Sequence, residues 1–116
     1  MIMMASRISG SSTTRPLFID FDFYTDGDPE FKKELITLMI DDLHELQHTL
    51  HPGPIVPEVF NKVCHKIKSP LEMLNDKEML DLIAELKIIT TDPSRVTLLD
   101  KLCTDIVQSL QNELEK

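Results

Sequence analysis

The sequence predicts an all-α protein, an antiparallel up-and-down four-helix bundle preceded by an irregular N-terminal segment. Its 116 residues are enough for one compact core but too few for two. Glycine is sparse and aromatic residues are few, whereas Leu, Ile, Met, Glu and Lys are abundant, which favours helix over strand. Four amphipathic stretches with short breaks complete the prediction. We therefore divide the chain into a flexible tail, residues 1–16, and a bundle, residues 17–116.

The first bundle helix is predicted to begin at Pro29 and to run to about Leu50. Asp28 suits the N-cap and Pro29 the first helical position, where no N–H donor is needed. The segment HPGPIVP, residues 51–57, ends the helix. Apolar residues at spacings of three and four predict one buried stripe, made of Phe31, Leu35, Leu38, Met39, Leu43, Leu46 and Leu50.

Three further helices follow at short intervals. The second is predicted over residues 57–74, and Asn75 and Asp76 supply its stop and the cap of the third. Asp92 and Pro93 repeat the earlier Asp-Pro start and open the fourth. The third helix should bury Met79, Leu82, Ile83, Leu86 and Ile89, and the fourth Leu99, Leu102, Cys103, Ile106, Leu110 and Leu114.

The N-terminal part does not fit the helical pattern. Residues 6–16 are polar and lack the apolar content to fold alone, so we expect a tail. In LFIDFDFY, residues 17–24, apolar and more polar positions alternate as in a strand, but no partner strand is evident. We favour an irregular or short helical segment that lays its Phe side chains across the end of the bundle. A partner-binding edge is the alternative.

Charge and composition narrow the class of function. The net charge of −8 argues against a general nucleic-acid or anionic-membrane surface, because such binders need basic patches. Two cysteines without a paired framework favour a reduced, cytoplasmic protein. No apolar run approaches membrane-spanning length, so we expect a soluble protein.

His65 is the residue most suited to chemistry. At about 100° of rotation per residue, it lies at the centre of the second helix's polar face, opposite Val59, Phe60, Val63, Ile67, Leu71 and Leu74. An exposed neutral imidazole is a nucleophile, and Lys68, one turn away, can donate to a phosphoryl group placed on it. Spacing alone nevertheless favours a simpler interpretation, a solvated histidine and lysine without a chemical role.

A family resemblance favours the chemical interpretation. The segment CHKIKSPLEML, residues 64–74, resembles the phosphoacceptor segment of histidine-containing phosphotransfer (HPt) domains at His65, Ile67, Lys68 and Ser69. GDPEFKKELITLMIDDLHEL, residues 27–46, is similar to that family's opening helix, and the resemblance covers roughly residues 26–114.

The resemblance implies a monomeric bundle that carries phosphate between proteins. His65 would accept a phosphoryl group from the aspartate of a receiver domain and pass it to another receiver, with Lys68 stabilising the group. The implied partners are receiver domains of response regulators or hybrid histidine kinases. The protein needs no cofactor of its own, because the receiver supplies Mg²⁺, and it has neither kinase activity nor an ATP site. The residues expected at the docking surface are Asn61, Lys62, Lys66, Ser69, Glu72 and Met73.

Three positions depart from the family pattern. Ser69 stands where the family usually has Gly, and Asn75 near another frequent Gly; both substitutes suit the sites, since Ser is small and Asn tolerates the left-handed conformation. Pro70 is unusual within the helix and predicts a kink just after His65, because it lacks a backbone donor and pushes on the carbonyl of Lys66.

Pro70 also creates a second resemblance. HKIKSPL, residues 65–71, resembles the H-box of sensor histidine kinases, which lies on a dimeric helical hairpin. Lys66 replaces the acidic residue of that box, and the chain has no room for an ATP-binding domain and no glycine-rich nucleotide motif. A dimeric phosphotransferase derived from a kinase core therefore stays the structural alternative.

Other functions find less support in the sequence. An adaptor bundle that binds receivers or kinases without carrying phosphate is the alternative from a different class. His44, His48 and His51 share one helix face and could hold Zn²⁺ or Ni²⁺, but no fourth ligand is indicated, so we predict no metal site. Cys64 and Cys103 fall on apolar faces and are expected in the core.

Overall fold

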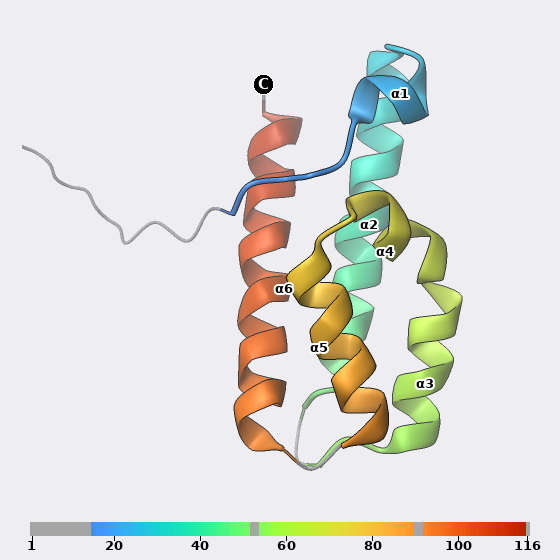
Figure 1. Cartoon of the computed structure of the whole chain (residues 1–116). Coiled ribbons are helices and arrows are strands. Elements are labelled where there is room, and N and C mark those ends of the chain that lie inside the picture. The colour runs from blue at the N-terminus through green and yellow to red at the C-terminus, as the bar shows by residue number, and fades with distance from the viewer. Residues whose placement is uncertain (1–14, 52–53, 90–91, 116) are drawn as a thin grey trace, which may run out of the picture.

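The computed structural model describes residues 15–51, 54–89 and 92–115, and this part of the chain is all-helical (Figure 1). Within these ranges there are six helices and no strand, which confirms the predicted all-α class. The helices are α1 (Phe21–Thr25), α2 (Pro29–His48), α3 (Pro57–Lys66), α4 (Lys68–Leu74), α5 (Lys77–Ile88) and α6 (Pro93–Leu114).

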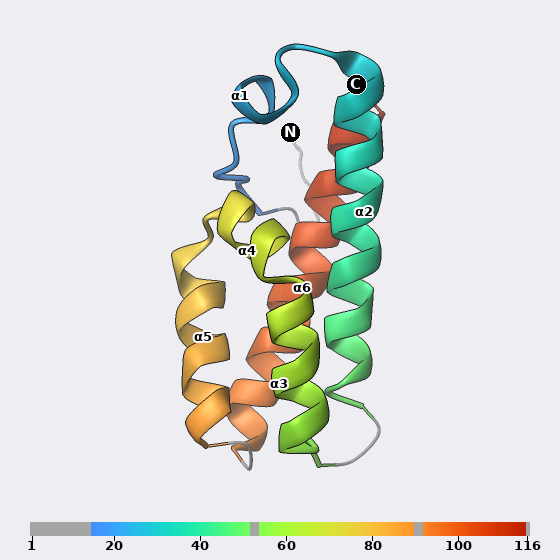
Figure 2. The ribbon, with the colours of Figure 1, turned by 90° about the vertical axis from the view of Figure 1, so that its right-hand side faces the viewer.

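The long helices lie side by side around a common core. α2 packs against α3 and α6, and α5 packs against the same two helices, so each of the four contacts two others. Figures 1 and 2 show α2 and α5 running in one direction and α3 and α6 in the other, with α4 above the end of α3. Among the described residues, no helix is both long and apolar enough to cross a membrane.

Three aspartates begin three of these helices, as the sequence predicts. Asp28 accepts a hydrogen bond from the amide of Glu30 at 2.9 Å, and Asp92 accepts one from the amide of Ser94 at the same distance. Asp76 accepts one from the amide of Met79 at 3.2 Å. Each carboxylate satisfies amides that have no partner within the helix, which fixes where α2, α5 and α6 start.

The helix expected over residues 57–74 is broken at Ile67. That residue has φ −99° and ψ 18°, and it ends α3 and precedes α4. Pro70 is the third residue of α4, in the first turn, where its missing N–H costs little. The predicted kink after His65 is thus confirmed. Asn75, at φ 53°, ends α4 in the left-handed conformation expected of it.

The core follows the predicted stripes with exceptions on α2. Phe31 and Leu38 are 48% and 51% exposed, so their assignment to the stripe was wrong. Both residues lie about a third of a turn from the centre of the buried face of α2. Ile36 and Ile40, which were not assigned to the stripe, are buried on that face. The core also contains Leu35, Met39, Leu43, Leu46, Leu50, Phe60, Val63, Ile67, Leu71, Leu74, Met79, Leu82, Ile83, Leu86, Leu99, Leu102, Cys103, Ile106 and Leu110.

Two further apolar positions differ from the prediction. Val59, placed opposite His65, is 49% exposed because it lies at the margin of the buried face of α3. Ile89 is 48% exposed because α5 ends at Ile88 and the backbone of Ile89 leaves the helical conformation, with φ −121° and ψ 87°. Leu114 is only partly buried, against the end of the core.

The N-terminal segment forms an irregular stretch followed by the short helix α1, as favoured from the sequence. Only one of its three phenylalanines is covered: Phe21 is buried, with the ammonium of Lys32 5.3 Å from its ring centroid. Phe18 and Phe23 are 55% and 76% exposed, so the expectation that all would cover the bundle's end was wrong. The alternative of a strand edge finds no strand among the residues described here.

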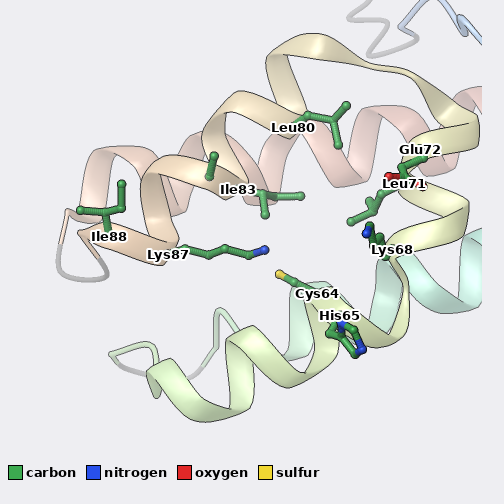
Figure 3. A pocket seen from close by; sticks show the side chains of 10 residues that line it. Cys64, His65, Lys68, Leu71, Glu72, Leu80, Ile83, Lys87 and Ile88 are labelled. Atoms are coloured by element: carbon green, nitrogen blue, oxygen red, sulfur yellow. The ribbon is translucent and has the colours of Figure 1, made fainter.

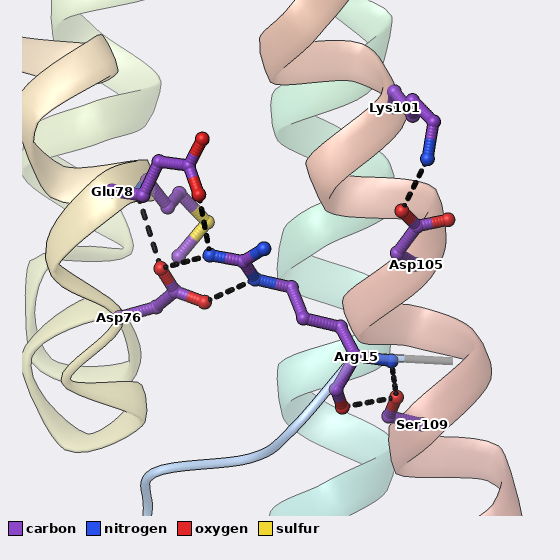
Figure 4. A network of polar contacts seen from close by, with 7 residues as sticks. Arg15, Asp76, Glu78, Lys101, Asp105 and Ser109 are labelled. Carbon is purple, nitrogen blue, oxygen red and sulfur yellow. Dashed lines mark hydrogen bonds and ion pairs between the residues drawn. The ribbon is translucent and has the colours of Figure 1, made fainter. Parts of the chain in front are cut away.

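Arg15 marks where the packed part of the chain begins. Its guanidinium contacts Asp76, the N-cap of α5, and Glu78 in the first turn of that helix. Its backbone amide donates to the hydroxyl of Ser109 on α6, and that hydroxyl donates to its carbonyl (Figure 4). Arg15, expected within the flexible tail, is therefore held against the bundle. Residues 1–14, and Pro52 and Gly53 of the predicted break, lie outside the described residues.

Candidate functional site

A groove lies between α3 and α4 on one side and α5 on the other (Figure 3). Its volume is about 540 Å³. The first wall carries Cys64, His65, Lys68, Leu71 and Glu72, and the second carries Leu80, Ile83, Ala84, Lys87 and Ile88. Because α3 packs directly on α5, residues about twenty positions apart in the sequence face each other across it.

His65 lies in the last turn of α3, on the groove's edge. The same helix buries Phe60, Val63 and Cys64, and this leaves His65 on the exposed side, as the sequence predicts. Within the described part of the chain its imidazole has no ion-pair or hydrogen-bond partner. The ring nitrogens are therefore available to a reactant that approaches from solvent.

Lys68 reaches the same groove from the far side of the helix break. It is the first residue of α4, and it is exposed. The break at Ile67 does not separate Lys68 from His65, because the buried Ile67 side chain keeps both neighbouring segments against the core. His65 and Lys68 therefore line the same groove.

Lys87 is the lining residue that sequence reasoning missed. It lies on α5, and Figure 3 shows its side chain extending across the groove toward Cys64. Burial raises the pKa of the Cys64 thiol to about 11, and the positive charge of Lys87 partly opposes that rise. No sequence signal pairs Lys87 with His65, because only the packing of α5 on α3 brings them to one groove.

The other residues expected at the docking surface divide into two groups. Asn61, Lys62 and Ser69 are exposed but do not line the groove, whereas Glu72 is exposed and lines it. Glu72 is therefore the acidic lining residue of the groove, and the role of the four residues in docking stays a prediction.

Lys66 and Met73 face differently from the prediction. The Lys66 ammonium lies 3.0 Å from a carboxylate oxygen of Glu45 on α2, so it is directed away from the groove although it is exposed. Met73 was expected to be exposed, and this was wrong. It is half-buried and packs on the core, because α4 turns that side of the chain inward.

An apolar stripe, exposed at two of its three residues, borders the site on α5. Leu80, Ala84 and Ile88 are four residues apart and therefore lie on one helix face. Ile88 is 84% exposed, which is unusual for a large aliphatic side chain at a helix end. The groove thus combines the ammonium groups of Lys68 and Lys87, which have no ion-pair partner among the described residues, with apolar contact surface.

The three histidines on and just after α2 lie apart from this groove. His44, His48 and His51 line a second cavity of about 510 Å³ together with Gln47 and Asp100. The Nε2 atom of His51 is 3.3 Å from a carboxylate oxygen of Asp100. In the described ranges, no three His, Cys, Asp or Glu side chains are grouped as ligands for a metal ion.

Both cysteines are buried, in agreement with the sequence. Cys64 and Cys103 are 3% and 0% exposed. Burial raises the pKa of the Cys103 thiol to about 12, with a smaller contribution from Asp100. Neither thiol is placed or ionised for nucleophilic chemistry.

The chain was compared with protein-family models, with curated proteins and with solved structures, and none of the three comparisons finds a match.

Proposed function

We propose that this protein is a histidine phosphotransfer protein of a two-component phosphorelay, with His65 as its phosphoacceptor. The observation that carries the proposal is an exposed, unpartnered histidine at the edge of a groove that also presents Lys68. The resemblance of residues 64–74 to the phosphoacceptor segment of HPt domains supports the same role.

The proposed architecture is a monomeric, antiparallel up-and-down four-helix bundle. α2, α5 and α6 form three of its helices, and α3 with α4 forms the fourth. The cyclic contacts among α2, α3, α5 and α6 support this arrangement. A dimer of helical hairpins, as in sensor kinases, would instead pair helices of two chains, and sedimentation equilibrium distinguishes the two.

The proposed reaction moves one phosphoryl group between two side chains. The neutral imidazole of His65, with its proton on Nδ1, attacks the phosphorus of a receiver's aspartyl phosphate through Nε2. The Nε2–P bond forms as the P–O bond to aspartate breaks, and aspartate leaves as a carboxylate. Transfer to a second receiver reverses these roles. The receiver supplies Mg²⁺, and Lys68 neutralises charge on the transferred oxygens.

The local charge supports an acidic partner surface. Although the chain carries a net charge of −8, Lys62, Lys68 and Lys87 lie at or near the groove, with Glu72 as its acidic lining residue. A receiver domain presents acidic residues around its aspartate, so this arrangement favours docking there. A cytoplasmic location follows from such partners.

The test is phosphoryl transfer from a Mg²⁺-loaded, phosphorylated receiver domain, followed as acid-labile phosphate on this chain. We expect label on the wild type and none on His65→Gln, with the far-UV circular dichroism unchanged because the side chain is exposed. His48→Gln, an exposed histidine on another face, is the matched control and should accept label normally. Label on His65→Gln would reject the assignment.

A non-phosphorylated adaptor is the second candidate. It is favoured by the apolar stripe of Leu80, Ala84 and Ile88, of which Ala84 and Ile88 are exposed, because such a surface suits docking without chemistry. Lys68→Ala separates the two functions. If it slows transfer more than it weakens receiver binding, the relay is supported. If receivers bind wild type but never transfer phosphate, the adaptor is supported.

A further inference from the structure

We propose that Lys87 is a second phosphoryl-binding residue, which contacts a phosphoryl group on His65 from the wall of the groove opposite Lys68. This inference rests on the proposed role of His65 as phosphoacceptor. It assigns to α5 a direct part in holding the transferred group.

The placement of the two lysines is the first argument. Lys68 lies on the wall that carries His65, and Lys87 lies on the facing wall. Figure 3 shows the Lys87 side chain reaching over the groove toward Cys64, the residue next to His65 in the chain. Figure 3 draws the His65 ring on the outer side of α3, so rotation about its side-chain bonds is needed to turn a group attached to it into the groove, where both lysines are lining residues.

The unpaired state of both ammonium groups is the second argument. The chain has 20 Asp and Glu against 12 Lys and Arg, so acidic partners are in excess. Lys66 and Lys77 have such partners in Glu45 and Asp81. Among the described residues, neither Lys68 nor Lys87 forms an ion pair.

The chemistry of the phosphoryl group is the third argument. A phosphoryl group carries nearly two negative charges at pH 7 and has three acceptor oxygens, more than one ammonium can neutralise. The apolar side chains of Leu71 and Ile83 line the same groove, so part of the group's surroundings is poorly polar and a nearby charge acts more strongly there than in water.

The test measures the protonation of the phosphoryl group directly and needs no receiver. His44, His48 and His51 are changed to Gln in the full-length chain, so that His65 alone can be phosphorylated by phosphoramidate. The phosphohistidine signal is then titrated by ³¹P NMR from pH 5 to pH 9. Nearby positive charge stabilises the dianion and lowers the titration midpoint.

We expect Lys87→Gln to raise this midpoint by about half a pH unit, an effect comparable to that of Lys68→Gln. Lys87→Arg, which keeps the charge, should restore the original midpoint. Lys77→Gln is the matched control, because Lys77 lies on the same helix, is exposed and is paired with Asp81. It should leave the midpoint unchanged.

The outcomes separate this inference from the proposed function. If Lys87→Gln shifts the midpoint no more than Lys77→Gln, Lys87 does not bind the phosphoryl group, whatever receivers do. If the shift appears but receivers never phosphorylate His65, the role of Lys87 is supported while the phosphorelay is rejected.

Discussion

The Nε atom of Arg15 lies 2.6 Å from a carboxylate oxygen of Asp76, the buried residue that caps α5 (Figure 4). One carboxylate thus joins the N-terminal segment to the start of α5. A second Arg15 nitrogen lies 3.0 Å from the other Asp76 oxygen, which makes the pair bidentate.

Asp76→Ala should lower the free energy of unfolding by about 2–4 kcal/mol, because it removes a helix cap and leaves Arg15 without its buried partner. Urea denaturation measures the change. Asp28→Ala is the matched control, since it removes an exposed cap alone and should cost about 1 kcal/mol. Equal losses for the two variants would show that the Arg15 pair contributes nothing.

The ion pair of Arg15 with Asp76 should make the free energy of unfolding depend on pH in the acidic range. Burial favours the neutral form of Asp76, but hydrogen bonds from Arg15 and from the amide of Met79 outweigh it, so the pKa of Asp76 lies below its ordinary value. A carboxylate with a lowered folded-state pKa stabilises the fold above its unfolded pKa, about 3.9, and this contribution is lost as pH falls further.

Arg15→Gln tests this dependence. The variant should be less stable than wild type at pH 7, and the difference in urea midpoints should shrink below about pH 4. Lys77→Gln serves as the control, because Lys77 pairs with the exposed Asp81. A constant difference between Arg15→Gln and wild type down to pH 2.5 would contradict this account of Asp76.

The cysteines should resist thiol reagents in the folded protein. Burial raises the pKa values of Cys64 and Cys103 to about 11 and about 12, so little thiolate exists at pH 8. Reaction with a disulfide reagent at pH 8 should be slower than in urea by at least about a hundredfold. Rapid labelling of Cys64 in a Cys103→Ser variant would show instead that the groove opens readily.

Pro70→Ala should change stability by less than about 1 kcal/mol, because Pro70 lies in the first turn of α4, where helices need no N–H donor. A proline inside a continuous helix would cost about 3 kcal/mol. Thermal unfolding compares the variant with wild type. Stabilisation by 2 kcal/mol or more would mean that α3 and α4 form one helix once Pro70 is gone.

The proposed function implies that Ile88→Ser weakens receiver binding about tenfold, since burial of such a side chain in an interface is worth more than 1.4 kcal/mol. Its 84% exposure means that the fold should tolerate the change. Calorimetric titration with a receiver domain measures the affinity. Leu38→Ser, at an exposed site on α2, is the control, and equal effects of both variants would place the docking surface elsewhere.

The sequence determined the helices, their caps and the exposure of His65, because these depend on residues close together in the chain. Helix starts are predictable at Asp28, Asp76 and Asp92, because each carboxylate accepts a hydrogen bond from an amide two or three positions later. Helical spacing likewise identifies the polar face on which His65 and Lys68 lie. Such local patterns failed at the margins of the buried stripe, as at Phe31 and Leu38, and where a helix ends, as at Ile67 and Ile89.

The tertiary structure alone decided which distant residues share the site. Packing of α5 on α3 brings Lys87 to the groove beside His65, and contact of α2 with α3 directs Lys66 to Glu45. Arg15 reaches Asp76 across 61 positions of sequence. Helical periodicity predicts which face of a helix is buried, but it does not predict which other helix covers that face. Contacts between residues on different helices therefore cannot be predicted from local patterns in the sequence.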